Sequence, residues 1–375
     1  MKEQQSVDPG PEHGQGSKPE EGPTPKGRRW KIAPGYRRIA TLFVALAFLV
    51  VFVLLGTLVR VPYVALGPGP TVNTLGSVDD RQVVAIEGEP TDPTTGNLNL
   101  TTVSVTDGLT LFQSIGLWLS GDDELQPRDR VYPPGKSNEE VSQENRQQMT
   151  GSENSATIAA LAFLGRPLDL VVAGVDDKGP SAGQLQPDDD ITAVNGKPVE
   201  TSVALREAVA ALAPGTEVTL DVLRAGEPAT ATVTLAPNPD DAKKGYLGIS
   251  LSEQNGDPDL DISFDVGEIG GPSAGLMLTL AIIDKLSPGE LNGGEFIAGT
   301  GTIDSSGDVG EIGGITHKMQ AAREAGATAF LVPSGNCAEA KSDTPDGLTL
   351  VQVDTLDDAI AGLADLREGR TPPSC

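Results

Sequence analysis

Residues 271–283 read GPSAGLMLTLAII, and this stretch decides the fold of the carboxyl-terminal region. The alternating polar and apolar residues of Asp261–Val266 before it predict a half-buried strand, which the glycines within 267–271 end. Apolar residues then continue almost without interruption to Ser287-Pro288-Gly289, which predicts a buried helix. We therefore expect Ser273 at the amino end of this helix, where unpaired N–H groups and the positive end of the helix dipole stabilise a negatively charged oxygen.

A serine hydroxyl is a weak nucleophile and needs a base. The chain has two histidines, His13 in a polar amino-terminal tail and His317, which directly precedes Lys318. A helix is predicted after Gly313-Gly314, and adjacent residues on a helix point about 100° apart, so only one of His317 and Lys318 can face Ser273. The sequence favours Lys318, because burial disfavours the charged form of a lysine and lowers its pKa.

Three motifs, in order along the chain, resemble the proteolytic domain of Lon proteases. They are GPSAG at 271–275, TGTI at 300–303 and GGITHK at 313–318. The resemblance covers residues 245–370 and implies a dyad in which Ser273 is the nucleophile and Lys318 the base, with Thr300 supporting the serine. One departure is Thr302, where Lon enzymes commonly carry an acidic residue.

Strands predicted at Ala329–Val332 and Leu348–Val353, with a helix at Leu356–Leu366, indicate an α/β or α+β proteolytic domain. A further alternating segment, Asn97–Val105, lies far upstream. Residues 60–154 are accordingly expected to be an extracytoplasmic region that supplies the first part of the protease fold.

Residues 155–236 resemble a bacterial PDZ domain, which would be inserted in the protease fold or would precede it. The resemblance is carried by DDITAVNG at 189–196, by PGTEVTLDVLRAG at 214–226 and by a predicted helix at Ala204–Ala210. It implies a peptide groove along that helix, with the peptide carboxylate received by the N–H groups of Phe163, Leu164 and Gly165.

A second GPSAG occurs within this region at 179–183, but no GGI-x-x-K follows it. It comes after a charged turn and precedes a short polar segment that ends at Gln186-Pro187. We therefore expect Ser181 to cap a helix and not to act as a nucleophile.

The amino-terminal region predicts a single membrane anchor. Residues 1–38 are polar and carry eight Lys and Arg against five Asp and Glu, which indicates a disordered cytoplasmic tail. The following run, residues 39–59, has no charge over twenty-one residues and suits a transmembrane helix, with the remainder outside the cytoplasm. A cleaved signal peptide is the alternative, but the run is longer than the usual signal core.

Residues 109–119 predict an amphipathic helix. Its apolar residues Phe112, Ile115, Leu117 and Trp118 are expected to pack into the core, and a lipid-facing patch is the alternative.

Composition excludes several classes of site. The net charge of −26 argues against binding to nucleic acid. The segment Gly135-Lys136-Ser137 lacks the first glycine of a phosphate loop, since position 130 is Arg130, so no nucleotide site is expected. Two histidines and two cysteines without metal-ligand spacing predict no metal. Cys337 and Cys375 lie on the expected outer side and could form a disulfide, with two free thiols as the alternative.

The resemblance and these features together imply a membrane-anchored, PDZ-containing branch of the Lon-like serine proteases: an extracytoplasmic, ATP-independent endopeptidase without cofactors. Its substrates would be peptides or unfolded proteins. The alternative is a non-catalytic membrane scaffold that binds peptides through the PDZ-like domain. The sequence leaves homo-oligomerisation open.

Overall fold

The computed structural model describes residues 34–121, 123–267 and 269–375. It divides the chain into two compact units, Met1–Leu55 and Gly56–Cys375. Most of the predicted cytoplasmic tail, residues 1–33, lies outside the described residues.

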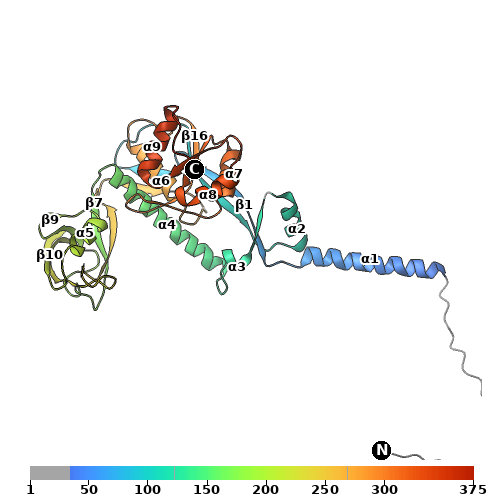
Figure 1. Ribbon diagram of the computed structural model, residues 1–375, viewed down its shortest axis with the longest axis horizontal. Coiled ribbons are helices and arrows are strands. Elements are labelled where there is room, and N and C mark those ends of the chain that lie inside the picture. Colours follow the sequence, from blue (N-terminus) through green and yellow to red (C-terminus); the bar gives the residue numbers. More distant parts are fainter. Residues whose placement is uncertain (1–33, 122, 268) are drawn as a thin grey trace, which may run out of the picture. The chain divides into compact units, whose positions relative to one another are not determined.

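Helix α1, Pro34–Leu58, contains a candidate membrane span of 23 residues at Tyr36–Leu58 (Figure 1). At 1.5 Å per residue it is roughly 35 Å long, enough to cross a hydrocarbon core of about 30 Å. Every side chain from Tyr36 to Leu55 is exposed, which suits an apolar helix surrounded by lipid.

A six-stranded sheet forms the centre of the second unit, with strand order β20-β19-β16-β5-β1-β6. Strands β20, β19, β16 and β5 run parallel, and β1 and β6 extend the sheet in antiparallel fashion. Strands from before and after the PDZ-like region therefore share one sheet, so that region is an insertion. The strand bounds are β1 Tyr63–Asn73, β5 Asn97–Thr106, β6 Glu124–Pro127, β16 Phe296–Gly299, β19 Ala329–Pro333 and β20 Thr349–Val353.

Helices cover both faces of this sheet, because its strands are apolar on both sides. On β19, Leu331 packs with α6 and α9, whereas Phe330 and Val332 pack with α7 and α8 on the opposite face. The expected α/β architecture is confirmed. The helix bounds are α6 Gly275–Leu286, α7 Ile315–Ala325, α8 Cys337–Ser342 and α9 Leu356–Arg367, with a short 3-10 helix at Ser334–Asn336.

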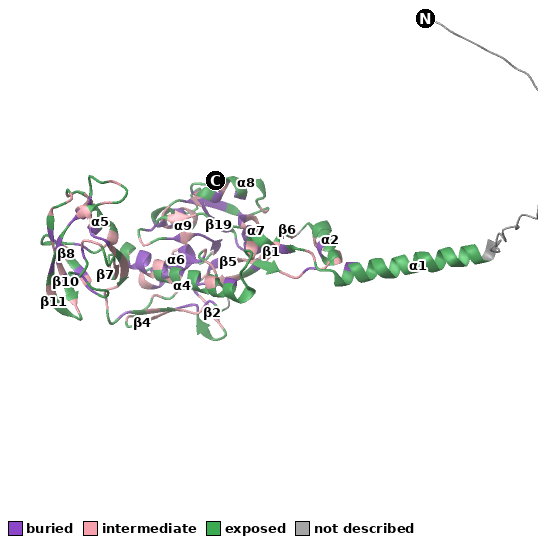
Figure 2. Ribbon diagram, turned by 90° about the horizontal axis from the view of Figure 1, so that it is seen from below, coloured by how far each residue is buried: buried purple, intermediate pink, exposed green. Residues whose placement is uncertain are grey.

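Helix α6 is the buried helix that the GPSAG stretch predicts. Each of its residues from Gly275 to Lys285 is buried (Figure 2). It starts two residues after Ser273 and ends at Leu286, directly before the Ser-Pro-Gly stop. Because α6 is buried on all sides, the surrounding core also fixes the turn at its amino end, which carries Ser273.

A second sheet, with strand order β11-β10-β8-β7-β14, forms the PDZ-like domain and has its own apolar core. The sheet and its preceding helix differ from the expected bounds 155–236. Strand β14 pairs with β7, so residues 249–255 join this sheet, and residues 155–163 form the end of a long preceding helix. The bounds are β7 Leu168–Val175, β8 Asp190–Val194, β9 Lys197–Pro198, α5 Ser202–Ala210, β10 Glu217–Arg224, β11 Glu227–Thr234 and β14 Ile249–Asn255.

That long helix is α4, Asn138–Phe163, which packs against α6 in the core beside the six-stranded sheet. It begins with a capping box, in which Ser137 accepts from the N–H of Glu140 and the Glu140 side chain accepts from the N–H of Ser137. Its last residues Ala156, Ala159 and Ala160 join the core around α6.

Helix α2, Leu111–Ser120, contradicts the expectation of core packing. Ile115, Trp118 and Leu119 are exposed, by 43, 69 and 71%. Phe112 and Leu117 are half-buried. A helix of ten residues beside the small edge strand β6 has too little neighbouring surface to cover its whole apolar face.

The remaining elements are small. A disulfide joins Cys337, at the start of α8, to Cys375, the last residue. The other elements are α3 Arg128–Val131 and four strand pairs: β2 Ser77–Val78 with β3 Arg81–Gln82, β4 Val84–Glu87 with β15 Asp261–Phe264, β12 Ala236–Pro237 with β13 Gly245–Tyr246, and β17 Thr302–Ile303 with β18 Val309–Gly310.

Candidate active site

Helix α4 holds the turn that carries Ser273. Gly271 adopts φ +96°, a conformation that favours glycine, and its N–H donates to the carbonyl of Asn145 at 2.8 Å. The hydroxyl of Ser152, two turns further along α4, donates to the carbonyl of Pro272 at 3.1 Å. The backbone on the amino side of Ser273 is thus fixed by two contacts with one helix.

The segment after β16 holds the serine from the other side. The carbonyl of Ser273 accepts hydrogen bonds from the N–H of Gly301 at 3.0 Å and from Oγ1 of Thr300 at 3.1 Å. The N–H of Leu276 donates back to the carbonyl of Gly301. Residues 273–276 and 300–301 therefore form one rigid backbone unit, although they are separated in the sequence.

Lys318 reaches this unit from α7. The helix starts after Gly314, which has φ +70° and therefore suits glycine, and Lys318 points inward from the end of its first turn. Nζ of Lys318 lies 2.8 Å from Oγ of Ser273 and 2.8 Å from Oγ1 of Thr300. The structure thus brings the three residues singled out by the motifs within hydrogen-bonding distance of one another.

Burial changes the chemistry of this amine. Lys318 is only 3% exposed, and desolvation lowers its pKa to about 8. It forms no ion pair with any carboxylate in the described parts of the chain, so no nearby negative charge offsets the desolvation. A substantial fraction of the amine is consequently neutral near physiological pH.

His317 faces away from the serine. Its Nε2 lies 3.6 Å from Oε2 of Glu124 on β6, and the side chain is 10% exposed. Within the described residues, Nε2 has no hydrogen-bond partner. The helix geometry that allows only one of the two neighbours to face Ser273 therefore selects Lys318.

Ser273 and Lys318 open into a cleft of about 930 Å³. One part of its wall is apolar, formed by Leu100, Met149, Val266 and Ile269. Arg81 and Arg146 also line the cleft. A volume of this size accommodates several residues of an extended peptide.

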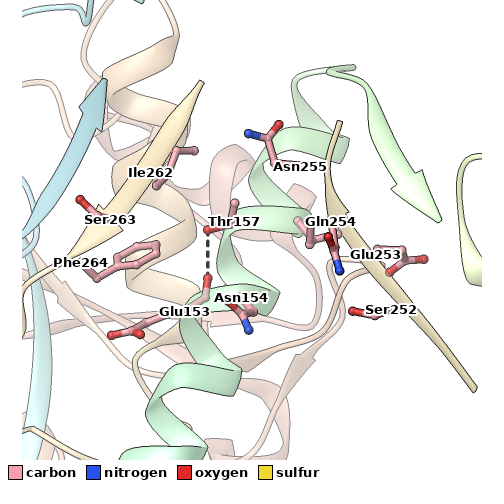
Figure 3. Close-up of a pocket in the computed structure, with 11 residues that line it drawn as sticks. Glu153, Asn154, Thr157, Ser252, Glu253, Gln254, Asn255, Ile262, Ser263 and Phe264 are labelled. Carbon is pink, nitrogen blue, oxygen red and sulfur yellow. Dashed lines mark hydrogen bonds between the residues drawn. The ribbon is translucent and has the colours of Figure 1, made fainter. Parts of the chain in front are cut away.

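A second cavity of about 490 Å³ lies further along α4 (Figure 3). Figure 3 shows Glu153, Asn154 and Thr157 of α4 between strand residues 252–255 and 262–264. The hydroxyl of Thr157 donates to the carbonyl of Glu153, and burial raises the pKa of the Glu153 carboxyl. Neither member of the Ser273–Lys318 pair lines this cavity.

The carboxylate loop expected at Phe163, Leu164 and Gly165 is wrongly placed. These residues end α4 and lead into β7, which already has β8 on one side and β14 on the other. An added peptide strand needs a free edge, and β7 has none. The edge strand that contacts α5 is β14, which begins at Ile249, directly after Leu247-Gly248.

The helix-cap expectation for Ser181 is also wrong. Residues 180–184 form turns and no helix. The side chain is fully buried, and its hydroxyl donates to the carbonyl of Leu247 at 2.6 Å. This duplicate GPSAG therefore supports the turn that leads into β14.

No motif in the sequence predicts Asn145 and Ser152, the two residues of α4 that hold the GPSAG turn. The pattern Ser137-x-x-Glu140 does predict the start of α4, because a capping box marks the beginning of a helix. No local pattern indicates which face of that helix meets the GPSAG turn.

Comparison with known proteins finds both domains, with a PDZ match that includes most of α4 and ends before β14. Residues 256–364 match the Lon protease (S16) C-terminal proteolytic domain, and residues 141–235 match a PDZ domain. The chain carries a Lon-type serine protease domain and a PDZ domain. The Lon-type match starts directly after β14, in agreement with the sheet pairing.

Curated relatives are similar over parts of their length. The archaeal Lon protease of Methanothermobacter thermautotrophicus is 32% identical over 121 residues, which is 31% of this chain and 18% of that protein. Lon protease 2 of Syntrophobacter fumaroxidans is 33% identical over 109 residues, 28% and 13% of the two chains. A protein of Halomonas elongata named "Probable periplasmic serine endoprotease DegP-like" is 37% identical over 79 residues, 21% and 17%. The matched segments thus span less than a fifth of each relative.

Proposed function

We propose that the protein is a membrane-anchored, extracytoplasmic serine endopeptidase that works without ATP, with Ser273 as nucleophile and Lys318 as general base. The observation that carries this proposal is the buried contact of 2.8 Å between Nζ of Lys318 and Oγ of Ser273. A buried amine of lowered pKa next to a serine hydroxyl is the arrangement that activates a weak nucleophile.

In the proposed reaction, neutral Lys318 accepts the hydroxyl proton while Oγ of Ser273 attacks the peptide carbonyl carbon. We assign stabilisation of the negative charge on the carbonyl oxygen to N–H groups at the amino end of α6, the positive end of the helix dipole. The protonated lysine then gives its proton to the leaving amine, and water hydrolyses the acyl-enzyme. Thr300 holds the amine in line, since its Oγ1 accepts from Nζ while donating to the Ser273 carbonyl.

The proposed substrates are flexible peptides or unfolded proteins. The Ser273–Lys318 cleft is open to an extended chain, and its apolar wall offers room for an apolar side chain near the scissile bond. We assign peptide capture to the PDZ domain, at the free edge of β14 beside α5, where an added strand pairs through its main chain.

The proposed topology places the amino terminus in the cytoplasm. It is supported by the basic residues before the uncharged run 39–59, Arg37 and Arg38 among them, and by the single long apolar helix found in the described part of the chain. The disulfide between Cys337 and Cys375 suits an oxidising compartment. A carboxyl-terminal reporter that is active only in the cytoplasm tests this topology, and its activity would contradict it.

The decisive experiment is hydrolysis of casein by the full chain in lipid, together with labelling of the serine by a fluorophosphonate. Ser273→Ala should abolish both, and Lys318→Arg should lower both by a factor on the order of 10²–10⁴, since arginine stays protonated. Ser181→Ala is the matched control, because it changes the serine of the same five-residue motif and should retain labelling. A wild-type protein that binds peptides but is neither labelled nor active would instead be a peptide-binding scaffold.

A further inference from the structure

One face of α2 is apolar and uncovered. Leu111, Ile115, Trp118 and Leu119 are exposed by 36, 43, 69 and 71%, and their spacing places them in one stripe about 100° wide. The ten residues of α2 include no charged side chain. A large exposed apolar stripe on a folded helix marks an interaction surface.

The start of α2 is tied to the residues that follow the candidate membrane span. The N–H of Leu111 donates to the carbonyl of Val59 at 3.2 Å, and the N–H of Val61 donates to the carbonyl of Leu109 at 2.9 Å. Arg60 and Thr110 form a β-bridge between these two bonds. The first residue of α2 is therefore hydrogen-bonded to the residue immediately after α1.

A side-chain contact fixes the same position. Gly56, in the last turn of α1, is buried, and a Cβ atom there would collide with the ring of Phe112. Glycine thus allows the second residue of α2 to pack directly on the backbone at the end of the span. Where α1 leaves a membrane, α2 must begin at the same depth.

Both ends of α2 are capped by residues next to it in the chain. Thr110 and Gln113 form a capping box at its amino end, and Gly121, with φ +77°, donates to the carbonyl of Leu117 at its carboxyl end. The exposed stripe is thus a preformed surface, and its attachment to the end of the span determines which partner it can reach.

We propose that α2 lies along the outer surface of the lipid bilayer, with the stripe of Leu111, Ile115, Trp118 and Leu119 inserted at the interface. Interfacial helices bury their apolar face about 5–10 Å into the boundary between head groups and acyl chains, and tryptophan prefers that depth. The proposal rests on the membrane anchor stated under Proposed function. The protein would then contact the membrane through two helices, because α1 would cross the bilayer and α2 would lie on its surface.

Trp118 reports its own surroundings, because Trp30 is the only other tryptophan in the sequence. The full chain carrying Trp30→Phe is placed in lipid nanodiscs whose acyl chains carry bromine either near the head groups or deep in the core. We expect Trp118 fluorescence to be quenched more by shallow than by deep bromines and little by aqueous iodide. The control adds Trp118→Phe and Phe163→Trp, because Phe163 is 41% exposed at the far end of α4. The indole at position 163 should be quenched by aqueous iodide and little by bromine at either depth.

Equal quenching of Trp118 and the control indole by iodide, without bromine quenching, would overturn the inference. Shielding of Trp118 from both quenchers would also overturn it, because another protein surface or a second copy would then cover the stripe. Flotation of the chain with alkaline-washed vesicles separates the two proposals. A chain that does not float refutes the anchor and the inference with it, whereas a floating chain with a water-exposed Trp118 refutes the inference alone.

Discussion

The pH dependence of serine labelling tests the base most directly. Fluorophosphonate labelling of Ser273 needs a deprotonating group but no peptide substrate, so its rate follows the neutral fraction of Lys318. With a pKa of about 8, roughly one tenth of the amine is neutral at pH 7. At the ordinary lysine value of 10.5 that fraction would be only about one in three thousand.

The expected profile follows from these fractions. The labelling rate should rise about tenfold from pH 6 to pH 7 and level off above about pH 8. The shift of the pKa corresponds to about 3 kcal/mol, which is the cost of burying the ammonium group at 3% exposure without a carboxylate partner.

The measurement is the second-order labelling rate of the full chain in lipid between about pH 5.5 and pH 10. His317→Gln is the matched control and should keep the inflection, because His317 contacts Glu124 and not the serine. An inflection near the usual histidine range that disappears in this control would refute the lysine mechanism. An inflection above pH 10 would refute the desolvation argument.

Three further outcomes are expected. Lys318→Met should be inactive, yet below pH 8 it should be up to about 3 kcal/mol more stable to unfolding than the wild type. This difference in thermal unfolding should vanish as pH rises from 8 to 10.5, because in that interval residue 318 of the wild type binds a proton only in the unfolded chain. Ser181→Ala should raise KM for substrates captured by the PDZ domain and leave serine labelling unchanged, since the hydroxyl supports the Leu247 carbonyl before β14; equal loss of labelling would contradict this. Replacing Cys337 and Cys375 by serine should lower unfolding stability by about 2–4 kcal/mol under oxidising conditions, and an unchanged melting temperature would argue against the bond.

The parts of the site that the sequence could predict are those encoded locally. An almost wholly apolar run predicts the buried helix α6, and the GPSAG turn before it predicts where Ser273 stands. The 100° step between helical neighbours requires that His317 and Lys318 face different ways. Such features depend on residues within one or two turns of each other, so the order of residues alone determines them.

Long-range packing decided what the sequence left open or gave wrongly. Strand β14 lies between the PDZ segment and α6 in the sequence, and only its pairing with β7 shows that it belongs to the PDZ sheet. The same pairing moves the peptide edge away from Phe163–Gly165. Strand pairing joins residues far apart in the chain through backbone groups that every residue possesses, so side-chain patterns carry little information about the partner.

The two copies of GPSAG and the helix α2 show the same division. Identical residues place Ser273 beside a buried amine and Ser181 beside a carbonyl, because different segments pack against the two turns. The sequence predicted an amphipathic helix at residues 109–119, where α2 spans Leu111–Ser120, but not what its apolar face contacts. That was decided by the tertiary structure, since the bonds to Val59 and the packing of Phe112 on Gly56 hold α2 at the end of the span and leave Trp118 exposed.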